Sequence, residues 1–298
     1  MIYVDRSTKD IWGSKISCWG LSEMVKMAIK NRTASFLSGS LFLVCAEGTI
    51  SAGAVEIAAH EASYSMSLLS VDKDSQMAGI KGKTNFTIRR DCDGWKSSEN
   101  YVLEFDYQSG ETAIMASRFS SWEELAGQLY SFEVHEGSTF EDEKQFTGYA
   151  NLPPVAERAE AFFSMQPDTA MPLPDRVFFP VAHTRELLDK AEQGGKLFSA
   201  HIFFGAEPDR ALKRTSSVIG ARQTVKNGNR LGQLSTQSYY PIQIAYFDPN
   251  SSEAVPEYEI TFHMLPNGVV AYYEVDYGTF AIDAELVDVK PLPQPNCS

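Results

Sequence analysis

Apolar side chains at every second position constrain the fold of this chain more than any other feature. From about residue 60 onward, apolar or aromatic residues alternate with polar ones in successive runs, most clearly at 101–107, 130–134, 238–247 and 258–264. Successive side chains of a β-strand point to opposite faces, so a period of two is typical of strands that bury one face. The pattern therefore predicts a protein built mainly from β-strands.

Turn-forming residues separate these runs at short intervals, for example at 91–94, 109–110 and 137–138. Parallel strands need long crossover connections, whereas antiparallel strands can be joined by tight turns. The spacing thus favours an antiparallel meander, curved or barrel-like. The proline-rich stretch 150–175 is interpreted as an irregular crossing with one strand at 157–165, and not as a domain boundary.

A single amphipathic helix is predicted at residues 180–194. Pro180 suits the first helical turn, which does not use its missing N–H, and Gly194-Gly195 suits a helix C-terminus. One face is largely apolar and is expected to pack against the sheet, covering one of its open sides; partner binding is the alternative. This face carries Val181, Thr184, Leu187, Leu188 and Ala191.

The C-terminal segment has the clearest strand pattern. Alternating residues at 258–264, at 269–277 and from 280 onward predict a three-stranded meander. Asn267-Gly268 between the first two strands predicts a type I′ hairpin turn, because both residues tolerate a positive φ.

Residues 1–54 are predicted to be an N-terminal extension plus a secretory signal peptide, and residues 55–298 a single domain. Basic residues at 26–32 precede an uncharged apolar run at 34–46 and a small-residue cleavage site at 52–54. The apolar run is too short to span a membrane, so no stable span is expected after removal of the signal. Met1, Met24 and Met27 remain alternative start sites.

Charge and cysteine content restrict the partners and the compartment. The net charge of −13 argues against a nucleic-acid partner, whose phosphates require Lys and Arg. Of the four cysteines, two lie in residues 1–54, and Cys92 and Cys297 remain. An isolated pair in an oxidising compartment most often forms a disulfide, with two buried free thiols as the alternative.

No motif for catalysis, a metal or a cofactor stands out. None of the five histidines has a zinc-ligand spacing, and a structural hydrogen bond is expected for His183. The acidic runs Glu123-Glu124 and 141–143 are interpreted as solvated turns rather than as a glycosidase pair. We expect no metal, no cofactor and no catalytic residue. If the sheet curls, aromatic side chains could line a groove for acyl chains or a peptide, with an ordinary core as the alternative; the candidates are Tyr240, Tyr246, Phe203 and Tyr273.

Several stretches together resemble the EipB family of bacterial periplasmic proteins associated with cell-envelope integrity. They are HEASY at 60–64, Cys92, FPVAH at 179–183, VIG at 218–220, YPIQIAYF at 240–247 and the whole of 256–297. The resemblance implies a periplasmic location in a Gram-negative bacterium. It also implies a long antiparallel sheet wound into a spiral or open barrel, with one helix packed against it. Cys92 and Cys297 match the paired cysteines of the family. No catalytic residues are carried over.

The resemblance implies a role in cell-envelope integrity, and with it we expect a non-enzymatic periplasmic protein that acts by binding a protein, a lipoprotein or a lipid. The alternative is a periplasmic hydrolase that acts on peptidoglycan or lipid. An enzyme should show polar side chains with shifted pKa values clustered in a cleft, and a carrier should show an apolar, aromatic-lined groove.

Overall fold

The computed structural model describes residues 55–153, 158–225 and 228–297, which belong to one compact unit. The predicted extension and signal peptide at 1–54 lie outside the described residues. The strands are β1 His60–Val71, β2 Met77–Arg90, β3 Gly94–Tyr107, β4 Thr112–Glu124, β5 Leu129–Ser138, β6 Lys144–Asn151, β7 Glu160–Phe163, β8 Gln166–Pro172, β9 Val177–Phe178, β10 Leu197–Phe203, β11 Leu212–Ile219, β12 Gln223–Thr224, β13 Ser238–Phe247, β14 Tyr258–Met264, β15 Val270–Asp276 and β16 Phe280–Pro291. The 3-10 helix η1 spans Gly228–Leu234.

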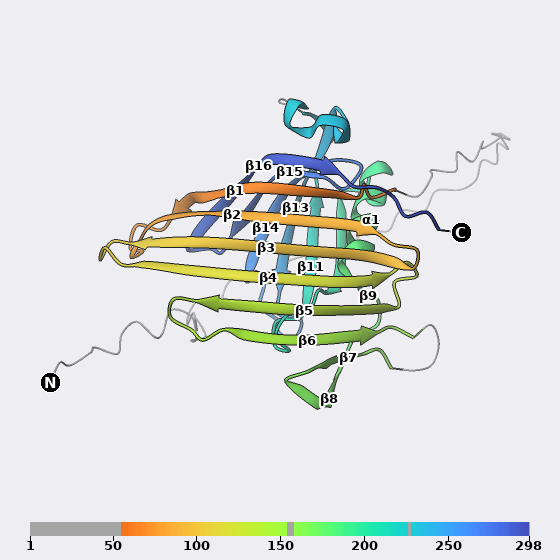
Figure 1. The fold of residues 1–298 in the computed structure, drawn as a ribbon, viewed down its shortest axis with the longest axis horizontal. Helices are drawn as coiled ribbons and strands as arrows, with labels where there is room; N and C mark the ends of the chain where they lie inside the picture. Colours follow the sequence, from red (N-terminus) through yellow and green to blue (C-terminus); the bar gives the residue numbers. More distant parts are fainter. Residues whose placement is uncertain (1–54, 154–157, 226–227, 298) are drawn as a thin grey trace, which may run out of the picture. The chain divides into compact units, whose positions relative to one another are not determined.

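These strands form one 16-stranded sheet with two open ends, which confirms the predicted all-β class. Its order runs from β8 back to β1, then through β16, β15, β14, β13, β11 and β10 to β9, with β12 paired to β13. Nearly all neighbours are antiparallel; β9 and β10 are the parallel pair. In Figure 1, β1–β6 lie side by side in front, and β11, β13 and β14 run behind them at a steep angle.

The sheet curls until the strands near its two ends face each other. Tyr130 and Phe132 on β5 pack against Phe203 on β10, with ring centroids 6.1 and 6.0 Å apart. The Tyr130 hydroxyl donates a 2.8 Å hydrogen bond to the carbonyl oxygen of Phe204. Strands β5–β7 and β9–β11 thus share one core although they are separated in the sheet order.

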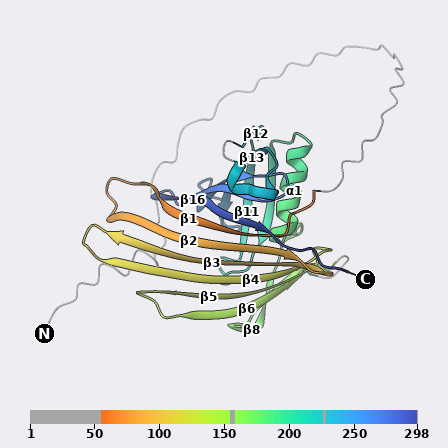
Figure 2. The same ribbon diagram turned by 45° about the horizontal axis from the view of Figure 1, so that its top comes forward.

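The helix α1 (Pro180–Glu192) lies inside this curve, as Figure 2 shows from a second angle. Its buried residues are Val181, His183, Leu187, Leu188 and Ala191. They share a core with Ile88 and Trp95 on one side and with Ile242 and Ile244 on the other. The predicted apolar face thus packs in the core. The structure differs from the prediction at two positions: His183 joins the buried residues, and Thr184 is partly exposed.

The C-terminal meander forms as predicted, but its first turn has another geometry. The Gly268 N–H donates to the carbonyl oxygen of Leu265, which places Pro266 and Asn267 at the centre of the turn. Gly268 has a φ of 80°, whereas Asn267 does not have the positive φ that a type I′ turn requires. The Leu265 N–H then bonds to Val269, which closes a three-residue loop. Pro266 has its own φ fixed near −65°, so it takes the first central position of the turn and Asn267 takes the second. Only Gly268, the next residue, is left-handed.

The proline-rich stretch also differs from the single strand predicted at 157–165. It holds a short hairpin, in which β7 pairs with β6 and with β8. Strand β8 carries Pro167 and Pro172 and lies at one end of the sheet. Proline lacks the N–H that an inner strand needs, so these residues are tolerated at an edge.

Cys92 and Cys297 come together at disulfide-bonding distance, with their Cα atoms 5.5 Å apart. That separation lies within the usual range for disulfides. Cys92 follows β2, and Cys297 is in the tail after β16, so the bond ties the C-terminal tail to the turn between β2 and β3.

We predict that this disulfide stabilises the fold under oxidising conditions. The sequence separation is 205 residues. By loop-closure entropy, a bond across such a loop stabilises by roughly 5 kcal/mol. A Cys297→Ser variant should therefore melt at a lower temperature than the unsubstituted protein, and the difference should vanish when both are reduced. Non-reducing peptide mapping should link Cys92 to Cys297. Two free thiols in protein purified from an oxidising compartment would contradict the prediction.

Candidate binding site on the outer face of the sheet

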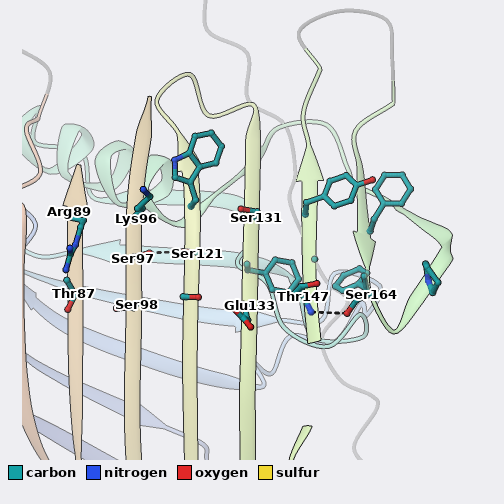
Figure 3. A pocket seen from close by; sticks show the side chains of 18 residues that line it. Thr87, Arg89, Lys96, Ser97, Ser98, Ser121, Ser131, Glu133, Thr147 and Ser164 are labelled. Carbon is teal, nitrogen blue, oxygen red and sulfur yellow. Dashed lines mark hydrogen bonds between the residues drawn. The ribbon is translucent and has the colours of Figure 1, made fainter. Parts of the chain in front are cut away.

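A hollow of about 840 Å³ lies on the outer face of the sheet, over strands β2–β7. Its side chains alternate along each strand with buried ones: Ser131 and Glu133 on β5, for instance, flank the buried Phe132. Figure 3 shows labelled members of the set on neighbouring strands. The central strands β3–β6 are each paired on both sides, so the hollow has a continuous, fully hydrogen-bonded floor.

Strand register arranges the lining residues in two parallel rows across the strands. The row nearer the β2–β3 and β4–β5 turns is called the aromatic row, and it consists of Arg89, Lys96, Trp122, Ser131, Tyr149 and Phe162. The second is called the hydroxyl row, and it consists of Thr87, Ser98, Ser120, Glu133 and Thr147. With strands about 4.8 Å apart, six neighbouring strands span about 24 Å.

Two features hold the aromatic side chains in place. The Tyr149 and Phe162 rings stack with their centroids 4.9 Å apart. Trp122 lies close over Gly94 of the neighbouring strand: a Cβ atom at Gly94 would be 2.6 Å from the indole Nε1. Glycine at this position therefore allows the indole to lie against the sheet. Tyr149 is nevertheless 52% exposed, so its ring is accessible from solvent.

Charge in the hollow is divided between its two sides. Arg89 and Lys96 supply positive charge at the β2–β3 side, and Lys96 pairs with Asp91 at 3.0 Å. Glu133 lies on β5, where hydrogen bonds from His135 and Gln145 hold its pKa below the ordinary value. Glu133 is thus a stable carboxylate acceptor, while the opposite side is suited to an anionic group.

The predicted groove residues are not among those that line this hollow. Tyr240 and Tyr246 are buried in the core around the helix, and Phe203 lies in the core that joins the sheet ends. Tyr273 packs against a third core, 5.4 Å from the ring of Tyr64. The structure does not bring the four together, because each points to the inner face at a different place along the curled sheet.

Near Tyr64 and Tyr273, a carboxylate faces the interior of the sheet. Glu99 accepts a 3.2 Å hydrogen bond from the Thr84 hydroxyl. Burial raises the pKa of Glu99 above its ordinary value, and its charge in turn raises the pKa values of Tyr64 and Tyr277 after the larger effect of their own burial. Glu99 is in phase with Tyr101, so the alternation itself marks it as inward-facing.

Glu123 is a second buried carboxylate and corrects the interpretation of this pair as a solvated turn. It is 3% exposed and points to the first turn of α1. Its oxygens accept hydrogen bonds from the N–H groups of Val181 and Ala182, both at 2.7 Å. Phe179, at the N-cap, offers no side-chain hydrogen bond, so Glu123 replaces the usual cap. Burial raises the pKa of Glu123 to about 7, against the lowering effect of these hydrogen bonds.

His183, one turn into the helix, also lies in the core. Its ring is 5.5 Å from that of Phe198 and 6.3 Å from that of Phe178. The Nε2 atom is buried without a hydrogen-bond partner, so the predicted structural hydrogen bond is not made by that atom. Burial lowers the pKa of His183 to about 4.

Within the residues that the structure describes, no group of three or more His, Cys, Asp or Glu side chains could hold a metal ion. Nor does that part of the chain contain a helix long and apolar enough to cross a membrane.

The outer hollow was missed by sequence reasoning because its members are ordinary surface residues. Ser98, Ser120 and Thr147 each lie between inward-facing neighbours in a different strand. They meet only through strand register, which local patterns do not specify. The available signal was a set of large aromatic residues out of phase with the inner face, namely Trp122, Tyr149 and Phe162.

Comparison with known proteins shows a consistent relationship. A model of the EipB-like family matches residues 51–293. The cell envelope integrity protein EipB of Brucella abortus (strain 2308) is 27% identical over 243 residues, which cover 79% of this chain and 85% of that protein. The crystal structure of a beta-barrel-like protein of a domain of unknown function, also from Brucella abortus, superposes with a TM-score of 0.73 at 25% identity. The match covers 80% of this chain and all of that one.

Removal of the Glu123 carboxylate should destabilise the fold. In a Glu123→Ala variant, the buried Val181 N–H loses its acceptor, and an unpaired buried group costs about 1–3 kcal/mol. We expect urea unfolding at neutral pH to show a loss of about 2 kcal/mol or more. Glu61→Ala, at an exposed position of β1, is the matched control and should change little. Equal stability of the two variants would contradict the capping role.

His183 should make the fold sensitive to acid. The unfolded chain binds a proton at this side chain near the ordinary pKa of 6.5, whereas the folded chain does so only near 4. The contribution is thus fully present above about pH 6.5 and is lost as the pH falls toward 4. We compare the free energy of unfolding of His183→Phe with that of the unsubstituted protein, measured by urea unfolding. Between pH 7 and pH 4.5 this difference should shift by about 2–3 kcal/mol in favour of the variant. His201→Phe, on the partly exposed β10, is the control; an equal gain there would refute the assignment.

Proposed function

The chain belongs to the EipB-like family, and we propose that it supports the integrity of the cell envelope as a non-enzymatic periplasmic protein that binds a partner through its outer hollow. The family match over residues 51–293 carries the envelope role. The curated relative, a cell envelope integrity protein, supports the same role. The periplasmic location is supported by the signal-peptide pattern in residues 1–54 and by the paired cysteines, which suit an oxidising compartment.

Binding, rather than a purely structural role, is supported by the architecture of the hollow. Strands β3–β6 give it a rigid floor, since every one of them is paired on both sides. Trp122 and the stacked Tyr149–Phe162 pair present ring surfaces there, and the Gly94 contact holds the indole in position. Rigid aromatic side chains lose little conformational freedom on binding, which is why they dominate recognition surfaces.

The alternative, a periplasmic hydrolase acting on peptidoglycan or lipid, would need an accessible acid–base pair. Three carboxylates of the described residues have raised pKa values, and none supplies such a pair in the hollow. Glu123 is committed to two helix N–H groups, and Glu99 is bonded to Thr84. Glu274 lies on β15, outside the hollow, where burial and then the charges of Asp276 and Asp283 raise its pKa. In the hollow, the pKa of Glu133 is held low, which suits an acceptor rather than a general acid. These features favour binding over hydrolysis.

A complementation experiment tests the proposal. Deletion of the gene should sensitise cells to detergent, and the full-length chain should restore growth. Trp122→Ala should restore it poorly, because the ring surface of the hollow is lost. Tyr272→Ala removes an aromatic side chain from the outer face of β15, outside the hollow, and should restore growth fully.

Three outcomes would count against the proposal. A deletion strain without envelope sensitivity would refute the envelope role. Full rescue by a stably folded Trp122→Ala variant would show that the hollow is not needed for that role. Release of soluble fragments from peptidoglycan or phospholipid vesicles by the purified protein would replace binding by hydrolysis. Fractionation of cells expressing the full chain should place it in the periplasm. Native mass spectrometry of that fraction should detect a bound protein, lipoprotein or lipid.

A further inference from the structure

We propose that the outer hollow binds a glycan strand that carries isolated carboxylate groups. This inference rests on the proposed function, since it names the ligand class for the same surface. The ligand would lie across strands β2–β7, along the two rows of side chains. Three observations point to this chemistry: the ring surfaces in one row beside the hydroxyl groups of the other, the paired floor beneath them, and the placement of the cations.

The two rows match the two kinds of surface on a sugar ring. A pyranose has an apolar face of C–H groups, which carry partial positive charge, and a rim of hydroxyl groups. Aromatic faces carry partial negative charge, so Trp122 and Tyr149 can pack against the C–H face. Ser98, Ser120 and Thr147 in the hydroxyl row both donate and accept hydrogen bonds, as sugar hydroxyls do, and the Glu133 carboxylate accepts them.

The paired floor argues against an extended peptide. A peptide strand gains affinity by adding its main chain to a free sheet edge. Strands β3–β6 have no free edge, because each is hydrogen-bonded to a neighbour on both sides. The hydroxyl row likewise argues against an acyl chain, since covering hydroxyl groups without giving them partners costs free energy.

Charge complementarity specifies the carboxylates. Arg89 and Lys96 lie opposite each other on β2 and β3, at one end of the aromatic row. Both are exposed, but Lys96 already pairs with Asp91 at 3.0 Å, so Arg89 is the principal group for an anion. An arginine fork can bind a carboxylate through two parallel hydrogen bonds. The chain as a whole has a net charge of −13, which would repel a densely charged polymer. A glycan that is neutral apart from occasional carboxylates fits both the local positive charge and the net negative charge of the protein.

Calorimetric titration of the full mature protein with two tetrasaccharides tests the inference. One alternates N-acetylglucosamine with N-acetylmuramic acid and carries carboxylates; the other contains N-acetylglucosamine alone. The unsubstituted protein should bind the first more tightly. Trp122→Ala should weaken binding of both by about tenfold or more, and Tyr149→Ala, at a well-exposed site, provides a second test if Trp122→Ala unfolds. Arg89→Gln should abolish the preference for the carboxylate-bearing glycan.

Lys83→Gln is the matched control for Arg89→Gln. Lys83 is exposed on the same strand and the same face but outside the hollow, so the same loss of charge there should leave both affinities unchanged. Absence of binding to either glycan, or equal affinity of the unsubstituted protein and both aromatic variants, would overturn the inference. If Trp122→Ala also fails to restore envelope integrity in that case, the hollow has a different ligand and the proposed function stands. If the protein binds the glycan but the deletion strain shows no envelope phenotype, the glycan site stands and the proposed envelope function is refuted.

Discussion

The aromatic contact between the two halves of the sheet is the interaction on which the rest of the structure depends. Tyr130 and Phe132 on β5 meet Phe179 and Phe203 from the other half, with ring centroids 4.9 to 6.1 Å apart. All four are buried. Each such pair contributes about 0.5–1.5 kcal/mol beyond the burial of its area. Without this contact, the strands at the two ends of the order would have no common core.

Closure also determines where charge can be buried. Phe179 is both a member of the aromatic core and the N-cap of α1, so the same contact places the helix start beside β4. Glu123 can then bond to the N–H groups of Val181 and Ala182, where the positive end of the helix dipole favours a carboxylate. With the inner face of β2–β6 occupied by the core, the outer face remains available for a ligand. The interior thus stabilises the sheet, and the outer hollow is the surface that we propose for recognition.

Local pattern predicted the elements whose structure is decided by their own residues. The helix at 180–194 ends close to its predicted bounds because Pro180 and Gly194 act through their own backbone geometry. The predicted type of the turn at Asn267-Gly268 was wrong because Pro266, the residue before the pair, occupies the first central position of the turn. The interpretation of Glu123 as part of a solvated turn was wrong because its hydrogen-bond partners lie 58 and 59 residues away. They belong to a helix start that the local sequence does not connect to β4.

By itself, the sequence determined the all-β class, the single helix, the C-terminal meander and the resemblance to the family, because alternation, Pro and Gly act over a few residues. Only the tertiary structure decided which polar residues lie together. Thr87 and Thr147 belong to one row of the hollow through four successive strand registers, although 60 positions separate them in the chain. It likewise decided that the four predicted groove aromatics are divided among three cores. Register and curvature are set by packing over the whole sheet, so no single stretch of sequence contains them.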